Sequence, residues 1–373
     1  MILTNKHPEL VSVKIERSSC TDQTFCHLLE HPNIRTIHMH ACQITGKDLA
    51  VPKFSSLLDK LSLEDSLLTD AGFFNISRII NTDSLSTLDL TYTGVTLANL
   101  ADFNCTFNGL KVLRLLKCDS IIDVGIVELL NRIGPAMEEL YISTYLGSDL
   151  TLENIVSLER DFPFLRVLHL GFNIEDAALV GLFNRIGKQL EVLRLDCFYV
   201  TLNNFEDMTC NFSMLKYLEL SCSSLTDLGL MGLFNVIGRR LEKLSLLCRE
   251  VTLRNIEDMT STFPMLKVLQ LSCDSLTNPG LVGLCNRIGQ QLEKLSLSCP
   301  EVTLNNVEDM TCTFPMLNVL QINCPTITDH GLVGLCNRVG QKLEEFTILG
   351  INDPLSNCHD LKNSFPNCKF DFR

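Results

Sequence analysis

The chain has 373 residues, of which 46% are hydrophobic and 20% are charged, so it is too apolar for a disordered chain and is expected to fold. Its 31 lysine and arginine residues against 44 aspartate and glutamate residues give a formal net charge of −13 at pH 7. Because affinity for nucleic acid depends largely on basic side chains, this balance argues against a nucleic-acid-binding protein. The 66 leucines far exceed ordinary usage and indicate internal repeats.

The N-terminal residues 1–19 are interrupted by charged side chains and lack the unbroken apolar stretch of a signal peptide. No run of 18 consecutive apolar residues occurs in the sequence, so we expect a cytoplasmic protein that makes no membrane contact. The 17 cysteines are odd in number and contain no C-x-x-C pair, which favours reduced thiols over a disulfide scaffold.

A single motif, L-x-x-L-x-L, recurs in register over most of the chain. The motif ends in L-x-L, and apolar residues at every second position predict a short β-strand at every copy. Laid over each other without gaps, residues 241–291 and 292–342 are identical at 36 of 51 positions, so the larger unit is a pair of dissimilar repeats. The copies begin at Ile34, Leu58, Leu85, Leu110, Met137, Leu165, Leu190, Leu215, Leu241, Leu266, Leu292, Leu317 and Leu343.

Counted from Leu266 or from Leu317, the two halves of this pair differ in the segment that follows the strand. In the first half, Thr328 to Gly340 has apolar residues at helical spacing. It predicts an α-helix capped by Thr328 or Asp329, with Gly340 in the left-handed position beyond its end. In the second half, Val302 to Pro315 predicts a shorter helix with Thr303 as its N-cap. The closing glycine recurs at Gly134, Gly187, Gly238 and Gly289.

Each repeat is therefore predicted to form a strand, a turn, a helix and a return connection. Parallel strands stack about 4.8 Å apart whereas helices need about 10 Å, so the stack must curve. We expect an α/β solenoid shaped as a horseshoe, with a parallel sheet on the concave face and helices on the convex face. The expected parts are an N-terminal cap at 1–30, about thirteen repeats at 31–349 and a C-terminal cap at 350–373.

The segment from Leu110 to Gly125 reads L-x-x-L-x-L-x-x-C-x-x-I-x-D-x-G, and it resembles the cysteine-containing leucine-rich repeat of many F-box substrate receptors. Most other copies place the cysteine one residue earlier than Cys118. The alternation of two repeat types resembles the ribonuclease-inhibitor-like group. The resemblance covers residues 31–349 and implies a leucine-rich-repeat solenoid. It also implies two alternative functions, a substrate-recognition subunit of a ubiquitin ligase and the ligand-sensing region of an innate immune receptor.

Two sets of residues are candidates for metal or redox chemistry. Cysteines end nearly every strand, but free cysteine is among the most buried residue types, so we expect them to fill the core. His38, His40 and Cys42 lie close together in sequence, yet a structural zinc site needs four ligands and no local fourth is evident. The strand-end cysteines are Cys118, Cys197, Cys222, Cys248, Cys273, Cys299 and Cys324.

Catalytic motifs are not evident in the sequence. There is no phosphate-binding loop, dinucleotide fingerprint, metalloprotease helix or nucleophile elbow. We therefore expect a non-enzymatic protein that binds no metal and no cofactor. An enzyme or enzyme activator is a further alternative, which would require a catalytic residue on a loop.

The outward-facing strand positions are the candidates for binding. The middle outward positions of the copies between residues 114 and 219 carry large charged or aromatic side chains. The later copies carry mostly serine and glutamine there, which predicts a bland surface. Tyrosine and arginine anchor interfaces most often, so we expect the partner to bind the earlier copies, with Phe172, Phe198 and Tyr199 nearby. The predicted partner-binding residues are Arg114, Tyr141, His169, Arg194, Asp196, Tyr217 and Glu219.

Together these observations predict a protein-interaction scaffold that binds a protein partner on its concave face. The acidic net charge would steer a basic partner toward it. One continuous solenoid is expected, because a repeat array buries its core between neighbouring repeats and needs no second domain. The expected oligomeric state is a monomer.

Overall fold

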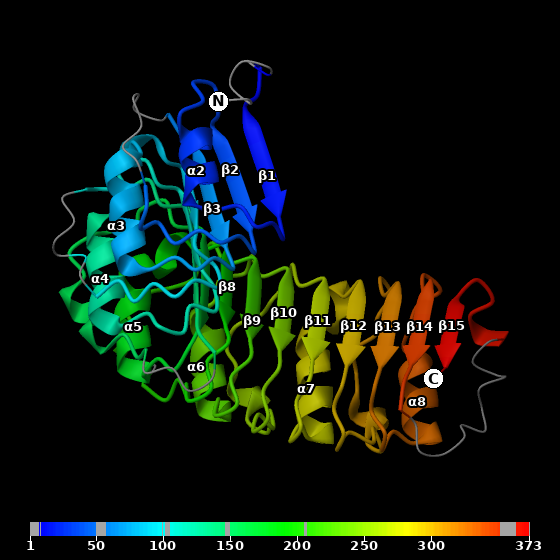
Figure 1. The fold of residues 1–373 in the computed structure, drawn as a ribbon. Helices are drawn as coiled ribbons and strands as arrows, with labels where there is room; N and C mark the ends of the chain where they lie inside the picture. Colours follow the sequence, from blue (N-terminus) through cyan, green and yellow to red (C-terminus); the bar gives the residue numbers. More distant parts are fainter. Residues whose placement is uncertain are drawn as a thin grey trace. The chain divides into compact units, whose positions relative to one another are not determined.

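The computed structural model describes residues 7, 9–49, 57–98, 100, 105–145, 150–204, 207–350 and 363–372. The chain divides into two compact units, unit 1 (residues 1–189) and unit 2 (residues 190–373). Within each unit the strands form one layer and the helices another (Figure 1). None of the helices in these described stretches has the length and apolar character needed to cross a membrane.

Unit 1 is a parallel sheet in which each strand pairs with the next along the chain. Its strands are β1 (Ser12–Glu16), β2 (Thr36–His40), β3 (Lys60–Glu64), β4 (Thr87–Asp89), β5 (Val112–Leu115), β6 (Glu139–Ser143) and β7 (Val167–Gly171). Its α-helices are α2 (Asp22–Leu29), α3 (Asp70–Ile79), α4 (Asp123–Arg132) and α5 (Asp176–Ile186). Its 3-10 helices include η1 (Thr82–Ser84), η3 (Glu153–Ser157) and η4 (Gly187–Gln189).

Unit 2 repeats this arrangement, with parallel pairing in chain order. Its strands are β8 (Val192–Leu195), β9 (Tyr217–Leu220), β10 (Lys243–Leu246), β11 (Val268–Leu271), β12 (Lys294–Leu297), β13 (Val319–Ile322), β14 (Glu345–Ile348) and β15 (Lys369–Phe372). Its α-helices are α6 (Asp227–Val236), α7 (Asn278–Ile288) and α8 (Asp329–Cys336). Its 3-10 helices include η6 (Ile256–Asp258), η7 (Gly289–Gln291) and η8 (Val307–Asp309).

The apolar positions of the repeated motif form the core between the two layers. In β12, for example, Leu295 is fully buried and Leu297 is 3% exposed, while the alternate residues Lys294 and Ser296 are partly exposed. This alternation confirms the strands expected from the sequence, and the layered arrangement confirms the α/β leucine-rich-repeat solenoid. The segment 1–30 contains β1 and α2, and the segment 350–373 contains β15; their residues 1–6, 8, 351–362 and 373 lie outside the described chain.

The second-half segments form 3-10 turns, so the helix expected from Val302 to Pro315 is wrong. Only Val307–Asp309 is helical there, and Asn306 is the residue that precedes it. Thr303 instead accepts a hydrogen bond from the backbone N–H of Asn305 at 3.3 Å. The apolar residues recur every three positions, which matches the 3.0 residues per turn of a 3-10 helix rather than the 3.6 of an α-helix.

The closing glycines do not adopt the left-handed conformation expected of them. Among the described glycines only Gly46 and Gly350 have positive φ. Gly340 is required by a close approach between repeats, because a Cβ there would lie 2.9 Å from Pro315 Cα and its N–H donates to Phe314 O at 3.1 Å. Equivalent approaches occur at Gly134 against Asn108 and at Gly238 against Ser213.

An aspartate or asparagine at the start of several first-half helices joins that repeat to the one that follows. Asp227 Oδ1 accepts the backbone N–H groups of Thr252 at 2.8 Å and Leu253 at 2.9 Å, and Oδ2 accepts the Thr252 hydroxyl. These bonds hold Leu253 at a φ of 56°, a left-handed conformation that costs a leucine about 1 kcal/mol or more. The same junction forms between Asp70 and Thr96, between Asp123 and Thr151, and between Asn278 and Thr303.

We predict that Asp227→Ala lowers the free energy of unfolding of the protein by about 2 kcal/mol, because three hydrogen bonds to a carboxylate are lost and Leu253 keeps its strained backbone. Urea unfolding followed by circular dichroism measures the change. The matched control is Asp227→Asn, which copies the junction that Asn278 makes and should lose clearly less stability. Equal losses in the two variants would show that the junction hydrogen bonds contribute little.

The homologous junction at Asp22 makes stability depend on pH. Burial opposes ionisation of Asp22, but hydrogen bonds from Thr45, Gly46 and Asp48 outweigh it and lower the pKa of this carboxyl below its ordinary value. Because the folded-state pKa is the lower one, ionised Asp22 stabilises the fold above the unfolded pKa of about 4, and this contribution disappears as pH falls through the folded pKa. Urea unfolding of Asp22→Asn should therefore show a weaker dependence on pH below about 4 than the wild type. An identical dependence would refute this contribution.

Candidate functional site

The strand register places outward-facing side chains in rows across neighbouring strands. In unit 1 the middle row brings Arg114 beside Tyr141 and Tyr141 beside His169. In unit 2 the middle row brings Arg194 beside Glu219, and Tyr217 lies two residues before Glu219 on β9. Six of the seven predicted binding residues, all except Asp196, therefore form two clusters, one in each unit.

The unit 1 cluster comprises Arg114, Glu139, Tyr141 and His169. The Arg114 guanidinium carbon lies 5.0 Å from the centre of the Tyr141 ring, and its Nη2 lies 3.4 Å from Glu139 Oε2. The Tyr141 hydroxyl donates to the same Glu139 oxygen at 2.9 Å, and the His169 ring meets the Tyr141 ring edge-on at 6.2 Å. Burial, followed by the hydrogen bond to Glu139, raises the pKa of Tyr141.

The unit 2 cluster comprises Arg194, Tyr217, Glu219 and Lys243. The Arg194 guanidinium carbon lies 5.0 Å and Lys243 Nζ lies 4.5 Å from the centre of the Tyr217 ring. Arg194 Nε lies 3.5 Å from Glu219 Oε2, and the Tyr217 hydroxyl donates to that oxygen. Burial, followed by the hydrogen bond to Glu219, raises the pKa of Tyr217 to about 12.

In both clusters an arginine, a tyrosine and a glutamate contact one another, although the tyrosine and the glutamate occupy exchanged positions on their strand. On β6 the glutamate precedes the tyrosine by two residues, whereas on β9 the tyrosine precedes the glutamate. The side chains are partly exposed, with relative exposures of 33% for Arg114 and 42% for Arg194. Each cluster therefore offers a ring and a guanidinium whose orientation is already set by their own contacts.

The remaining predicted residues behave differently from one another. Asp196 is exposed directly after β8, and Tyr199 is 68% exposed in the turn that follows. Phe172 is only 4% exposed, so the expectation that it adds to the binding surface is wrong: its side chain belongs to the core. The sequence prediction includes Tyr217 from the outward row two residues before the middle one, but it omits Glu139 and Lys243, which occupy the same row. Reading that row on every strand, rather than on β9 alone, predicts both.

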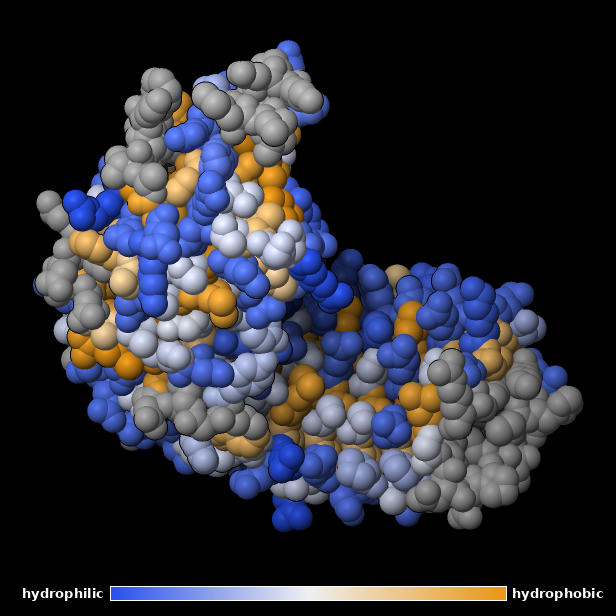
Figure 2. All heavy atoms as spheres, viewed as in Figure 1, coloured by the Kyte–Doolittle hydropathy of each residue, from blue (hydrophilic) through white to orange (hydrophobic). Residues whose placement is uncertain are grey.

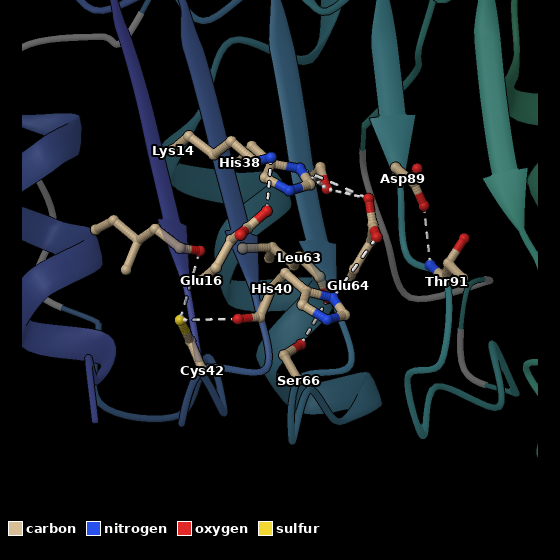
Figure 3. A network of polar contacts seen from close by, with 12 residues as sticks. Lys14, Glu16, His38, His40, Cys42, Leu63, Glu64, Ser66, Asp89 and Thr91 are labelled. Atoms are coloured by element: carbon tan, nitrogen blue, oxygen red, sulfur yellow. Dashed lines mark hydrogen bonds and ion pairs between the residues drawn. The ribbon is translucent and has the colours of Figure 1, made fainter. Parts of the chain in front are cut away.

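The first strands of unit 1 carry the histidine network shown in Figure 3. His38 Nδ1 lies 2.8 Å from Ser62 Oγ and 3.6 Å from Glu64 Oε1, and Ser62 donates to Glu64 at 3.0 Å. Serine and glutamate thus approach the same ring nitrogen, whereas a catalytic triad needs them on opposite nitrogens. His40 Nδ1 lies 3.7 Å from Glu64 Oε2, and the Cys42 thiol turns to backbone carbonyls.

No group of three or more histidine, cysteine, aspartate or glutamate side chains in the described stretches is arranged to hold a metal ion. The network in Figure 3 pairs its two histidines with one carboxylate that already accepts a serine hydroxyl. It therefore forms a polar surface patch on the sheet.

The strand-end cysteines fill the core, as expected from the sequence. All seven are fully buried, and several thiols donate to a carbonyl of the preceding strand, as Cys248 does to Leu220 O at 3.5 Å. Burial raises the pKa of Cys248 and of Cys273 to about 12, which keeps these thiols protonated and unreactive at neutral pH. Cys118 comes one residue later than most because Lys117, at a φ of 56°, adds a left-handed residue to its turn.

A groove of about 430 Å³ runs across the outward face of the strands in unit 2. Its lining comes from β9 to β14 and the residues that follow these strands, where the sequence predicted a bland surface. Serine side chains are short, so they leave space beside the longer glutamines. The outward-facing residues that line the groove are Glu219, Ser245, Leu247, Gln270, Ser272, Ser296, Ser298, Gln321, Asn323, Thr347 and Leu349.

Comparison with known proteins identifies the fold. No protein-family model and no curated protein matches the sequence. Similar solved structures are leucine-rich-repeat proteins, and all three described here are less than 20% identical to this chain.

Yeast Rad7, solved in complex with Elc1, has a TM-score of 0.52 and 18% identity over 94% of this chain and 83% of its own. An internalin of Listeria monocytogenes has a TM-score of 0.55 and 12% identity over 99% of this chain and 88% of its own. A leucine-rich-repeat protein of Leptospira interrogans has a TM-score of 0.50 and 15% identity over 98% of this chain and 84% of its own. These similarities establish the leucine-rich-repeat fold.

The hydrogen bond from Tyr217 to Glu219 can be tested by titration. We predict that Glu219→Gln lowers the pKa of Tyr217 below about 12, because a neutral amide removes the negative charge beside the hydroxyl while burial remains. Ultraviolet absorbance of tyrosinate follows the titration, and Tyr217→Phe assigns the step. The matched control, Glu139→Gln, should move the pKa of Tyr141 and leave that of Tyr217 in place. A Tyr217 step that Glu219→Gln leaves unmoved would contradict the contact.

Proposed function

We propose that this chain is a non-enzymatic interaction scaffold that binds a protein partner on the outward face of its strands. The observation that carries the proposal is the recurrence of an arginine, tyrosine and glutamate cluster on the strand face of both units. Arginine and tyrosine are the residues that most often dominate binding energy at protein interfaces. Each unit therefore carries one cluster in which an arginine and a tyrosine are available to contact a partner.

The internal contacts of the clusters favour binding for an entropic reason. Immobilising a flexible side chain at an interface costs about 0.5 to 1.5 kcal/mol, and part of that cost is already met when a ring and a guanidinium hold each other. The glutamate in each cluster offsets the charge of the arginine, so these anchors contribute surface and hydrogen bonds more than net charge. Long-range attraction of a basic partner comes from the net charge of −13.

We predict that Tyr141→Ala combined with Arg194→Ala reduces recovery of the main binding partner by tenfold or more, because one anchor is removed from each cluster. Affinity purification from the native lysate with quantitative mass spectrometry measures recovery. Thermal unfolding should change little, since both side chains are partly exposed.

The matched control for this experiment is Arg249→Ala combined with Arg254→Ala. It removes two exposed arginines from the segment that follows β10 and should retain the partner. Undiminished recovery with the Tyr141 and Arg194 double variant would rule out these clusters as the anchors. Equal loss in both double variants would point to charge alone.

A second candidate function is substrate recognition within a larger assembly, such as a ubiquitin ligase or an innate immune receptor. The similarity in fold to Rad7, which was solved in complex with Elc1, supports this candidate, as does the resemblance of the repeats to those of F-box receptors. In the same purification, an adaptor protein recovered equally with wild type and the Tyr141 and Arg194 double variant would favour it.

A further inference from the structure

The groove of unit 2 presents two rows of side chains. The middle row consists of Glu219, Ser245, Gln270, Ser296, Gln321 and Thr347 on successive strands. The second row consists of the residues that directly follow β10 to β14, which are Leu247, Ser272, Ser298, Asn323 and Leu349. Hydrophilic side chains cover much of this face, with hydrophobic ones among them (Figure 2).

The lining is electrically neutral apart from one compensated charge. Glu219 is its sole charged side chain among the described residues, and Arg194 lies 3.5 Å from that carboxylate. A charged ligand would therefore lose its hydration without meeting an opposite charge in the groove. An uncharged ligand does not pay this cost. Charge complementarity thus selects a neutral segment.

The amides of the lining offer both hydrogen-bond donors and acceptors. Ser296 Oγ donates to Gln321 Oε1 at 2.9 Å, and Asn323 Nδ2 donates to Ser298 Oγ at 3.1 Å. A side-chain amide has two N–H donors and an oxygen with two lone pairs, so one such bond leaves capacity for a ligand. A polypeptide backbone presents a donor and an acceptor at almost every residue and matches this mixture.

The spacing of the glutamines matches an extended chain. Gln270 and Gln321 stand 51 residues apart in equivalent repeats and two strands apart in the sheet, which corresponds to about 9.6 Å. Three residues of an extended chain in the polyproline II conformation span about 9.3 Å and complete one turn, so every third residue faces the same side. A peptide that crosses the strands therefore brings every third residue to an equivalent glutamine.

The ends of the second row are apolar. Leu247, which is 43% exposed, and Leu349 flank Ser272, Ser298 and Asn323. They are four strands apart, about 19 Å, which an extended peptide covers in about six residues. Compact small-molecule sites are lined mainly by hydrophobic and aromatic side chains, whereas this lining contains no aromatic ring in the described chain.

We infer that this groove binds an extended, uncharged peptide segment that crosses β10 to β14. The Gln270 and Gln321 amides hydrogen-bond to backbone groups three residues apart, and Leu247 and Leu349 contact two apolar side chains about six residues apart. The inference rests on the proposed function in that the ligand belongs to a protein partner. The groove would recognise a linear segment of that partner, while the arginine and tyrosine clusters bind elsewhere on it.

The experiment is selection of a phage-displayed library of random dodecapeptides on the full-length chain. Enriched peptides are then synthesised, and their affinities are measured by fluorescence polarisation for wild type and two double variants. Gln270→Ala with Gln321→Ala removes the groove amides. Gln290→Ala with Gln341→Ala is the matched control, because these exposed glutamines also stand 51 residues apart but precede β12 and β14 outside the groove.

The expected result is enrichment of uncharged peptides with two apolar residues five to seven positions apart. Their affinity should fall about tenfold or more in the Gln270 and Gln321 variant, since two hydrogen bonds are lost, and should stay unchanged in the control. Charged consensus peptides, peptides insensitive to the groove variant, or no enrichment would overturn the inference. Binding of neutral oligosaccharides on a glycan array, lost in the groove variant, would replace the peptide with a sugar ligand.

The peptide selection and the affinity purification test the groove and the clusters separately. Loss of the partner in the Tyr141 and Arg194 double variant, together with no groove-dependent peptide, would keep the scaffold and reject the peptide groove. Groove-dependent peptides together with undiminished partner recovery in that variant would keep the groove and reject the clusters as anchors.

Discussion

Parallel pairing of each strand with the next in chain order is the constraint on which the structure of each unit depends. A shift of one residue at any strand would turn its apolar side chains outward and its polar ones into the core. Differences in length between repeats occur in the turns instead, where they leave the strand register unchanged. Left-handed residues such as Ala41 and Lys117 lengthen the turns of unit 1 by one residue, yet the cysteines that follow them are buried like those of unit 2. The register also fixes which outward side chains become neighbours.

In both clusters the contacts depend on which outward-facing side chains are adjacent. They depend less on which position of the strand holds which residue. A tyrosine ring meets an arginine and a glutamate in both units although tyrosine and glutamate have exchanged places on the strand. The outward positions of one strand lie on the same side of the sheet, two residues apart, so either order brings the hydroxyl to the carboxylate. The contacts within such a cluster can therefore be kept when residues exchange places along the strand.

Features that depend on local spacing were predictable from the sequence. The strands follow from a period of two, and the first-half helices follow from a period near 3.6; Thr328 indeed caps α8 by accepting the N–H of Gly331. The helix expected from 302 to 315 failed because its apolar residues recur every three positions. The role of Gly340 was not predictable, because the backbone of Pro315 that crowds it belongs to another repeat.

The same distinction applies to the candidate site. The pairing of Arg114 with Tyr141 follows from the register of equivalent residues. Glu139 and Lys243 belong to the outward row two residues earlier, from which the sequence prediction took Tyr217 alone. The groove was missed because its volume depends on the small size of serine side chains, which a search for large anchoring residues passes over.

The near-identity of residues 241–291 and 292–342 gives the strand face of unit 2 a property that a globular site lacks. Each repeat contacts mainly its neighbours, so another 51-residue copy could be inserted without disturbing the junctions already present. Such a copy would add two strands and about 9.6 Å of face carrying the same chemistry. Gene duplication can thus lengthen this surface in fixed steps, so that its length depends on the number of copies rather than on new side chains.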